Sequence, residues 1–342
     1  MKKRVRFIDI ARGIAILCVI VRHFPIYYNV GWFSIAIKGQ YDVLNSFIMA
    51  IFFIISGYCF NANKFRYKKI LLDAKKLLIP YFANIVIWIC VLLSPFVLLR
   101  GYNTFKRNPY NMFESVVMGL SVTIKKGSIF NGPVEQIGAI WFFLSFFIAL
   151  VCFKLIMHLT KFEGQRILII SFFTILGVET YYNWLILPFD IQPAFCALPF
   201  MYFGYILKKI KLFEKFSILV LFSSGLIFLS SVFIKHGIAA GGIPLAKVSE
   251  YLIGVGSSIF ILSLSQLIEK IIPFKFTRPI EFYGRNSLAL LCFHHMEIHI
   301  FRFSAILTST LWIHIVLFFV LPMLAVLVFW KVPVINKIYN IS

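Results

Sequence analysis

Apolar runs recur along the whole chain, and short polar or charged stretches separate them. A helix that crosses a membrane needs about 20 apolar residues, because the hydrocarbon core is roughly 30 Å thick and its backbone groups must be hydrogen-bonded internally. The pattern predicts ten such helices, at residues 8–28, 42–61, 78–99, 140–158, 166–183, 193–210, 217–234, 247–268, 284–304 and 311–330. The fifth and sixth are short, and prolines at positions 188, 193 and 199 bound or interrupt them.

The composition agrees with a membrane bundle. Of the 342 residues, 61% are hydrophobic and only 14% are charged, unlike the composition of a soluble domain. We find no internal repeat, low-complexity tract or soluble domain in the sequence. We therefore expect an all-α fold, a polytopic bundle of about ten transmembrane helices, with a single domain over residues 1–342.

The distribution of basic residues predicts the orientation of the bundle. The net charge is +21, which in a soluble protein would suggest a nucleic-acid partner. With the N-terminus inside, 23 Lys and Arg fall on the cytoplasmic side and nine on the outer side. An even number of spans then puts both termini in the cytoplasm. We expect no nucleic acid as a partner, and we expect the basic inner face to contact anionic membrane lipids.

The first span carries four ionisable residues, Asp9, Arg12, Arg22 and His23. Because each helical residue turns by about 100° and rises about 1.5 Å, Arg12 and His23 lie about 20° apart around the axis and about 16 Å apart along it. Asp9 lies within about 60° of Arg12, whereas Arg22 points about 100° away from His23. Asp9, Arg12 and His23 thus form one stripe that starts at the cytoplasmic end.

Two interpretations of this stripe stay open from the residues alone. Arg12 can pair with Asp9 and extend toward the inner surface, with His23 as a packing residue. Alternatively the stripe lines a cavity, because a polar group as deep as His23 is costly in lipid unless it faces a cavity or a partner. A neutral imidazole with a pKa of about 6.5 takes and returns protons near neutral pH, which suits a general base.

The stretch 282–303 contains a second group of histidines. His294 lies ten residues after Gly284, about 15 Å above the start of the predicted span, at a depth similar to that of His23. His295 and His299 are four residues apart with Glu297 between them, a spacing that can chelate a metal. No HExxH or HxxEH string is present, and the six cysteines are isolated within predicted spans. We therefore predict no metal site and no disulfide framework.

Two shorter stretches have an adequate explanation in packing. Ser56 and Gly57 lie near the end of the second predicted span, where small residues permit close helix approach. Trp141 begins the fourth span, a position typical of an interfacial anchor.

With these residues in view, the chain resembles the acyltransferase-3 family of membrane acyltransferases over nearly its whole length, close to a fucose 4-O-acetylase-like branch that acetylates bacterial surface glycans. The family's signature of Arg, ten residues and His is met by Arg12 and His23 within "IDIARGIAILCVIVRH". Four later stretches resemble family motifs in the same order: "FFIISGY", "AIWFFL", "LPFDIQPAFCALPFMYFGYILKK" and "GRNSLALLCFH". The chain departs from the branch at residues 47–50, where Phe-Ile-Met-Ala replaces Phe-His-Met-Pro, and it lacks a proline after the Trp motif.

The resemblance implies transfer of an acetyl group from cytoplasmic acetyl-CoA to a sugar hydroxyl of a surface polysaccharide or its lipid-linked precursor. It implies a multi-pass protein of a bacterial inner membrane, with acetyl-CoA as a substrate and no permanently bound cofactor. His23 would act as general base or carry the acetyl group itself, and Asp9 would orient Arg12. The residues expected to bind the anionic donor are Arg12, Lys64, Arg66, Lys68 and Lys69. Those expected at the acceptor or in the cavity are Arg22, Ser56, Tyr58, Trp141 and His294.

Other classes of protein also carry charges within the membrane. A transporter or flippase for a sugar or lipid-linked glycan is the main alternative, although we find no inverted repeat with broken spans in matching positions. A scaffold within a polysaccharide assembly complex is a third possibility.

Overall fold

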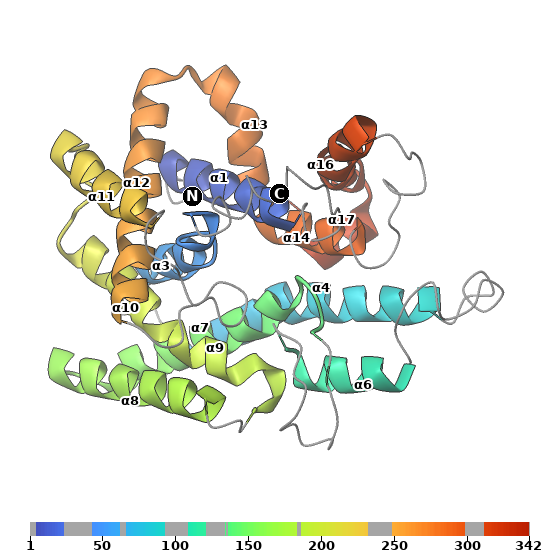
Figure 1. Cartoon of the computed structure of the whole chain (residues 1–342), viewed down its shortest axis with the longest axis horizontal. Helices are drawn as coiled ribbons and strands as arrows, with labels where there is room; N and C mark the ends of the chain where they lie inside the picture. The colour runs from blue at the N-terminus through green and yellow to red at the C-terminus, as the bar shows by residue number, and fades with distance from the viewer. Residues whose placement is uncertain are drawn as a thin grey trace. The chain divides into compact units, whose positions relative to one another are not determined.

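The structure is a computed structural model that describes residues 5–23, 43–61, 66–92, 109–120, 134, 136–182, 186–231, 248–297 and 311–341. These residues are almost entirely helical, which confirms the predicted all-α class (Figure 1). The helices are α1 (Arg6–His23), α3 (Ala50–Cys59), α4 (Lys68–Leu92), α6 (Pro109–Met118), α7 (Trp141–Leu159), α8 (Glu163–Tyr182), η4 (Pro188–Asp190), α9 (Ile191–Cys196), α10 (Leu198–Lys209), α11 (Ile218–Ser230), α12 (Val248–Ile271), α13 (Phe274–Arg285), α14 (Ser287–His295), α16 (Leu311–Phe329) and α17 (Pro333–Tyr339).

The chain divides by its internal contacts into two units, which are described separately below. Unit 1 comprises residues 1–61, 197–290 and 342, and unit 2 comprises residues 62–196 and 291–341. The boundary crosses α14 between residues 290 and 291.

Unit 1 contains α1, α3 and α10 to α13, and glycines set its closest helix contacts. A Cβ atom built on Gly57 of α3 would lie 1.8 Å from the carbonyl oxygen of Met201 on α10. A Cβ atom on Gly204 of α10 would lie 1.9 Å from the carbonyl oxygen of Ile54 on α3. The backbones of α3 and α10 therefore touch, which is the close approach that small residues allow in membrane helices. The packing interpretation of Gly57 is confirmed, and its partner is Met201.

Unit 2 is built around α7, which packs against α4 and α9. The largest fully buried side chains here include Tyr81 on α4 and Phe143 and Phe153 on α7. An ion pair between Lys154 and Asp73 joins α7 to α4.

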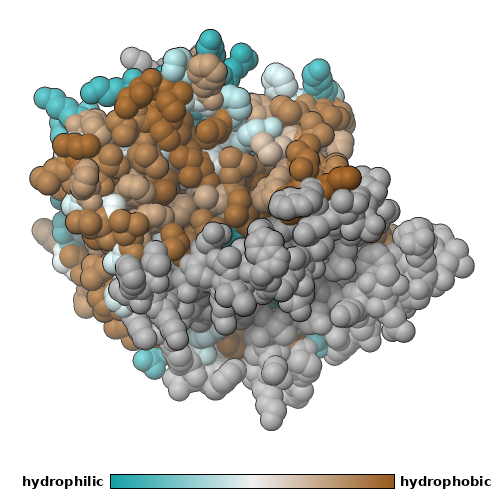
Figure 2. All heavy atoms as spheres, turned by 45° about the horizontal axis from the view of Figure 1, so that its top comes forward, coloured by the Kyte–Doolittle hydropathy of each residue, from teal (hydrophilic) through white to brown (hydrophobic). Residues whose placement is uncertain are grey.

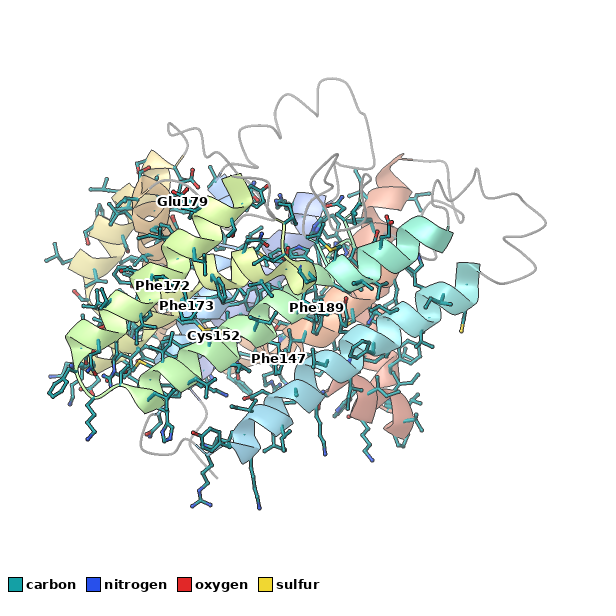
Figure 3. All side chains as sticks on the ribbon, turned by 90° about the horizontal axis from the view of Figure 1, so that it is seen from below. Phe147, Cys152, Phe172, Phe173, Glu179 and Phe189 are labelled. Carbon is teal, nitrogen blue, oxygen red and sulfur yellow. The ribbon has the colours of Figure 1, made fainter. Side chains whose placement is uncertain are left out.

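The helix α8 of unit 2 presents a buried and an exposed side. Phe173 packs against Phe195 of α9 with ring centroids 4.9 Å apart, whereas the adjacent Phe172 is 60% exposed. Figure 3 shows both rings near the middle of α8 and Glu179 nearer one end. The large exposed side chains of α8 are mostly apolar, as expected for a helix that faces lipid.

Three helices of the described residues are long and apolar enough to cross a membrane: Lys68–Val91, Trp141–Leu159 and Val248–Ile271. Ile315–Phe329 and Pro333–Tyr339 pass the same test together, as a pair bent by 116°. Val43–Cys59 and Ile218–Ser230 are shorter apolar helices. The count of ten spans and the cytoplasmic termini stay predictions, as does the single domain.

Several predicted spans differ from the structure in their course. The third, at 78–99, begins ten residues after α4 does, because α4 starts at Lys68. The sixth, at 193–210, is interrupted, because η4, α9 and α10 follow one another across residues 188–209. The ninth does not begin at Gly284, since this residue lies in α13 and a new helix starts at Ser287 after Asn286. The estimated height of His294 assumed one continuous helix from Gly284, and the break at Asn286 removes this assumption, so the depth of His294 in the membrane stays a prediction. The helix α13 itself was not predicted, because its charged residues break the apolar run.

Candidate functional site

The first four candidate residues all lie on α1, which is continuous from Arg6 to His23, as the sequence predicts. The start of this helix is held by two carboxylates of unit 1. The backbone N–H of Phe7 donates to Oε2 of Glu269 on α12 at 3.2 Å. Because the first N–H groups of a helix have no partner within the helix, Glu269 caps α1 and places negative charge at its positive end.

Arg6 fastens the same end of α1 to α13. Its Nη2 lies 2.9 Å from Oε1 of Glu281 and 3.0 Å from Oγ1 of Thr277. Thr277 also donates to Oε1 of Glu281 at 2.8 Å. This one carboxylate oxygen therefore accepts hydrogen bonds from both Arg6 and Thr277. The guanidinium of Arg6 lies 4.7 Å from the ring centroid of Phe274. Sequence reasoning missed all of these residues.

The helices α1 and α13 also cross in close contact, next to these hydrogen bonds. A Cβ atom on Gly284 of α13 would lie 1.8 Å from the carbonyl oxygen of Asp9, and one on Gly13 of α1 would lie 2.3 Å from the carbonyl oxygen of Ile280. The two helices are in contact at the level of Asp9 and Gly13. Backbone contact of this kind requires glycine at both positions.

Asp9 and Arg12 form a loose ion pair. Nη1 of Arg12 lies 3.9 Å from Oδ1 of Asp9, a separation longer than a hydrogen bond. The side chain of Asp9 is 8% exposed and that of Arg12 is 33% exposed. At this separation the two side chains do not share a hydrogen bond. The guanidinium, with five N–H donors, is thus positioned by Asp9 while retaining capacity for an anionic ligand.

His23 ends α1 with a defined ring orientation. Its Nδ1 lies 2.8 Å from the backbone carbonyl oxygen of Val19, and its side chain is partly exposed. A carbonyl oxygen only accepts hydrogen bonds, so Nδ1 carries the proton in this contact and the lone pair of the neutral ring is on Nε2. Nε2 is therefore the atom that can accept a proton. Arg22, its neighbour, is also partly buried.

Ser56 and Tyr58 lie on α3 in the same unit, both partly exposed. The ring of Tyr58 is 5.8 Å from that of Phe213, which is in turn 5.8 Å from Phe7 at the start of α1. The structure therefore brings Tyr58 to the Asp9 end of the stripe and away from the His23 end.

The remaining candidates belong to unit 2. Trp141 begins α7 and is 6% exposed. His294 is completely buried and packs edge-on against Phe318 with ring centroids 5.2 Å apart, while the adjacent His295 packs against Trp88 at 6.0 Å. That His294 shares a cavity with His23 stays a prediction.

The basic residues expected to bind the donor lie around the start of α4. Arg66 precedes this helix, Lys68 and Lys69 are in its first turn, and all three are exposed. Lys64 lies outside the described residues, as does His299. Within the described ranges, no group of three His, Cys, Asp or Glu side chains is arranged to hold a metal ion.

Comparison with known proteins connects this geometry to a family. A family model described as an acyltransferase domain, that of the acyltransferase-3 family, matches residues 5–331. No match was found among curated proteins or among solved structures. The matched range begins just before α1 and ends just after α16, so it includes the stripe on α1 and both glycine crossings of unit 1. This multi-pass membrane protein belongs to the acyltransferase-3 family and is a membrane acyltransferase.

Proposed function

We propose that this protein is an O-acetyltransferase of a bacterial inner membrane. It moves an acetyl group from cytoplasmic acetyl-CoA to a sugar hydroxyl of a surface polysaccharide or its lipid-linked precursor. The observation that supports this most strongly is the arrangement of α1. Arg12 and His23 lie on one unbroken helix whose start is fastened to α12 and α13.

Arg12 is suited to hold the donor. Its forked guanidinium matches a phosphate oxygen pair, and Asp9 restrains it at 3.9 Å without a hydrogen bond. Arg66, Lys68 and Lys69, with Lys64, would draw the anionic donor to the cytoplasmic face. Coenzyme A carries its phosphates and its thioester at opposite ends of an extended arm. A stripe about 16 Å long between Arg12 and His23 would accommodate such a molecule along α1.

His23 is suited to activate the acceptor. Nε2 takes the proton of the sugar hydroxyl while the hydroxyl oxygen forms a bond to the thioester carbonyl carbon. The tetrahedral intermediate then expels the CoA sulfur, which receives the proton from the imidazolium as the acetyl ester forms. The hydrogen bond from Nδ1 to Val19 keeps the ring in the tautomer that this step needs. No permanently bound cofactor takes part.

The experiment compares surface glycans from cells with no gene, the wild-type gene, His23→Ala or His158→Ala. His158 is an exposed histidine at the end of α7, so its removal is a matched control. Mass spectrometry and NMR measure ester groups, and membrane levels are measured in parallel. We expect an acetyl ester with the wild type and His158→Ala and none with His23→Ala, because a placed general base contributes about 10²- to 10⁴-fold.

Identical ester content in all four strains would overturn glycan acetylation. Ester formation that persists in His23→Ala would leave acyl transfer in place but remove His23 as its base. A flippase predicts a different result, namely glycans that change in amount or location while their chemistry stays the same.

A further inference from the structure

The segment from Lys270 to Arg278 covers the end of α12 and the start of α13, and it exposes large apolar side chains. Ile271 is 67% exposed, Phe274 53% and Phe276 63%. The corner between the two helices stands at the top of Figure 1, and Figure 2, where that side comes forward, shows apolar groups bordered by hydrophilic ones. Large apolar side chains that are exposed side by side mark a surface that contacts a partner or a membrane.

The charged residues of the same segment are all basic. Lys270, Lys275 and Arg278 are exposed and alternate with the apolar residues. Nζ of Lys275 lies 4.9 Å from the ring centroid of Phe276, so a cation and an aromatic ring are presented together.

The two carboxylates that flank the segment are engaged elsewhere. Glu269 accepts the hydrogen bond from the Phe7 backbone N–H, and Glu281, 6% exposed, binds Arg6 and Thr277. Both carboxylates therefore have partners on α1. The segment therefore presents positive charge that its own acidic neighbours do not neutralise.

The position of the segment relative to a membrane follows from α12. Val248–Ile271 is long and apolar enough to span a membrane, and the exposed segment begins where it ends. The opposite side of α13, with Thr277, Glu281 and Gly284, is buried against α1. The exposed side is thus fixed outward at the level where a bilayer changes from acyl chains to headgroups.

We propose that residues 270–278 form a binding surface for anionic phospholipid headgroups. Phe274 and Phe276 enter the boundary between headgroups and acyl chains, and Lys270, Lys275 and Arg278 bind the lipid phosphates. Exposed aromatic and basic side chains gathered at the end of a span are typical of the membrane interface. The predicted orientation puts this end of α12 at the cytoplasmic leaflet, where anionic lipids attract basic residues.

The test uses the full-length protein in nanodiscs and compares its association with spin-labelled phosphatidylglycerol and spin-labelled phosphatidylcholine. The variant K270Q/K275Q/R278Q removes the three charges. The control K209Q/K211Q/K215Q removes three exposed charges at the end of α10 and in the turn after it, on the same predicted cytoplasmic face, where Glu214 pairs with Lys211 at 3.2 Å. We expect the first variant to lose the preference for phosphatidylglycerol by about tenfold to hundredfold, and the control by a clearly smaller factor, because Glu214 already offsets one of its charges.

A second variant, F274S/F276S, tests the apolar contribution. We expect it to weaken association with phosphatidylglycerol while the remaining preference still declines with added salt. An unchanged preference in K270Q/K275Q/R278Q, or an equal loss in the control, would overturn the proposal. Displacement of phosphatidylglycerol by free coenzyme A would overturn it as well, because the surface would then bind the donor. The assay involves no acyl transfer, so its outcome is independent of the proposed function.

Discussion

Replacing Gly284 by alanine tests the close crossing between α1 and α13. The new Cβ atom would lie 1.8 Å from the carbonyl oxygen of Asp9 and 2.8 Å from the backbone nitrogen of Gly13. Ordinary contacts of a Cβ atom begin at 3.4 Å. Both opposing atoms belong to the backbone of α1 and cannot rotate away. The helices must therefore move apart.

The expected cost is the difference between two effects. Alanine is favoured over glycine within a helix by up to about 1 kcal/mol, whereas overpacking of a well-packed contact costs about 1–3 kcal/mol. Because the clash is with backbone, we expect the upper part of that range and a net destabilisation of about 2 kcal/mol. A displacement of α1 by about 1 Å at a catalytic group costs about 10²-fold in rate, so ester formation falls more steeply than stability.

Gly164→Ala is the matched control, because a Cβ atom there meets nothing within 4 Å and the residue lies in the first turn of α8. Both variants are compared with the wild type by thermal unfolding in detergent and by ester content per unit of membrane protein. We expect Gly164→Ala to match or slightly exceed the wild type in stability. If Gly284→Ala behaves like Gly164→Ala in both measurements, the two backbones are not in contact and the argument fails.

Three further changes test other parts of unit 1. Gly204→Ala places a Cβ atom 1.9 Å from the carbonyl oxygen of Ile54, so thermal unfolding should show a loss similar to that of Gly284→Ala; an unchanged midpoint would contradict the α3–α10 contact. Glu281→Gln removes the charge facing Arg6, whose side chain is 35% exposed, so we expect a loss below about 1 kcal/mol that shrinks at high salt. Arg12→Lys keeps the charge but loses the fork, and kinetics in membrane vesicles should show a higher KM for acetyl-CoA with kcat nearly unchanged; an unaltered KM would remove Arg12 from donor binding.

Uniformly apolar helices were well predicted from the sequence. The fourth predicted span, 140–158, corresponds to α7 at Trp141–Leu159, and the last, 311–330, corresponds to α16 at Leu311–Phe329. A uniformly apolar run is stable within a membrane as a helix, because its backbone N–H and C=O groups must form hydrogen bonds with one another. Polar residues mark where the two runs end, with Thr160 and Lys161 after α7 and Lys331 after α16.

The mixed segments were not predicted, for a physical reason. The helix α13 is amphipathic, and its partners are far away in the sequence, since Arg6 is 275 residues from Glu281. The local pattern of polar residues predicts that one face of this helix is polar, but it does not identify the distant side chain that binds to that face. A signal was nevertheless present: Thr277, Glu281 and Gly284 recur at helical spacing and define one side of a helix.

The glycine crossing also explains how the candidate stripe on α1 acquires a direction. Asp9 and Gly13 are four residues apart and lie within about 40° of each other around the helix axis, on the side that touches α13. Arg12 is turned about 100° from Gly13, so its side chain passes along the flank of the contact and remains 33% exposed. His23 lies about 20° from Arg12 on the same flank. Backbone contact at Gly13 and Gly284 resists rotation of α1 about its axis, because any larger side chain or turned surface would clash. The same contact thus sets the direction in which both the candidate donor-binding group and the candidate base project.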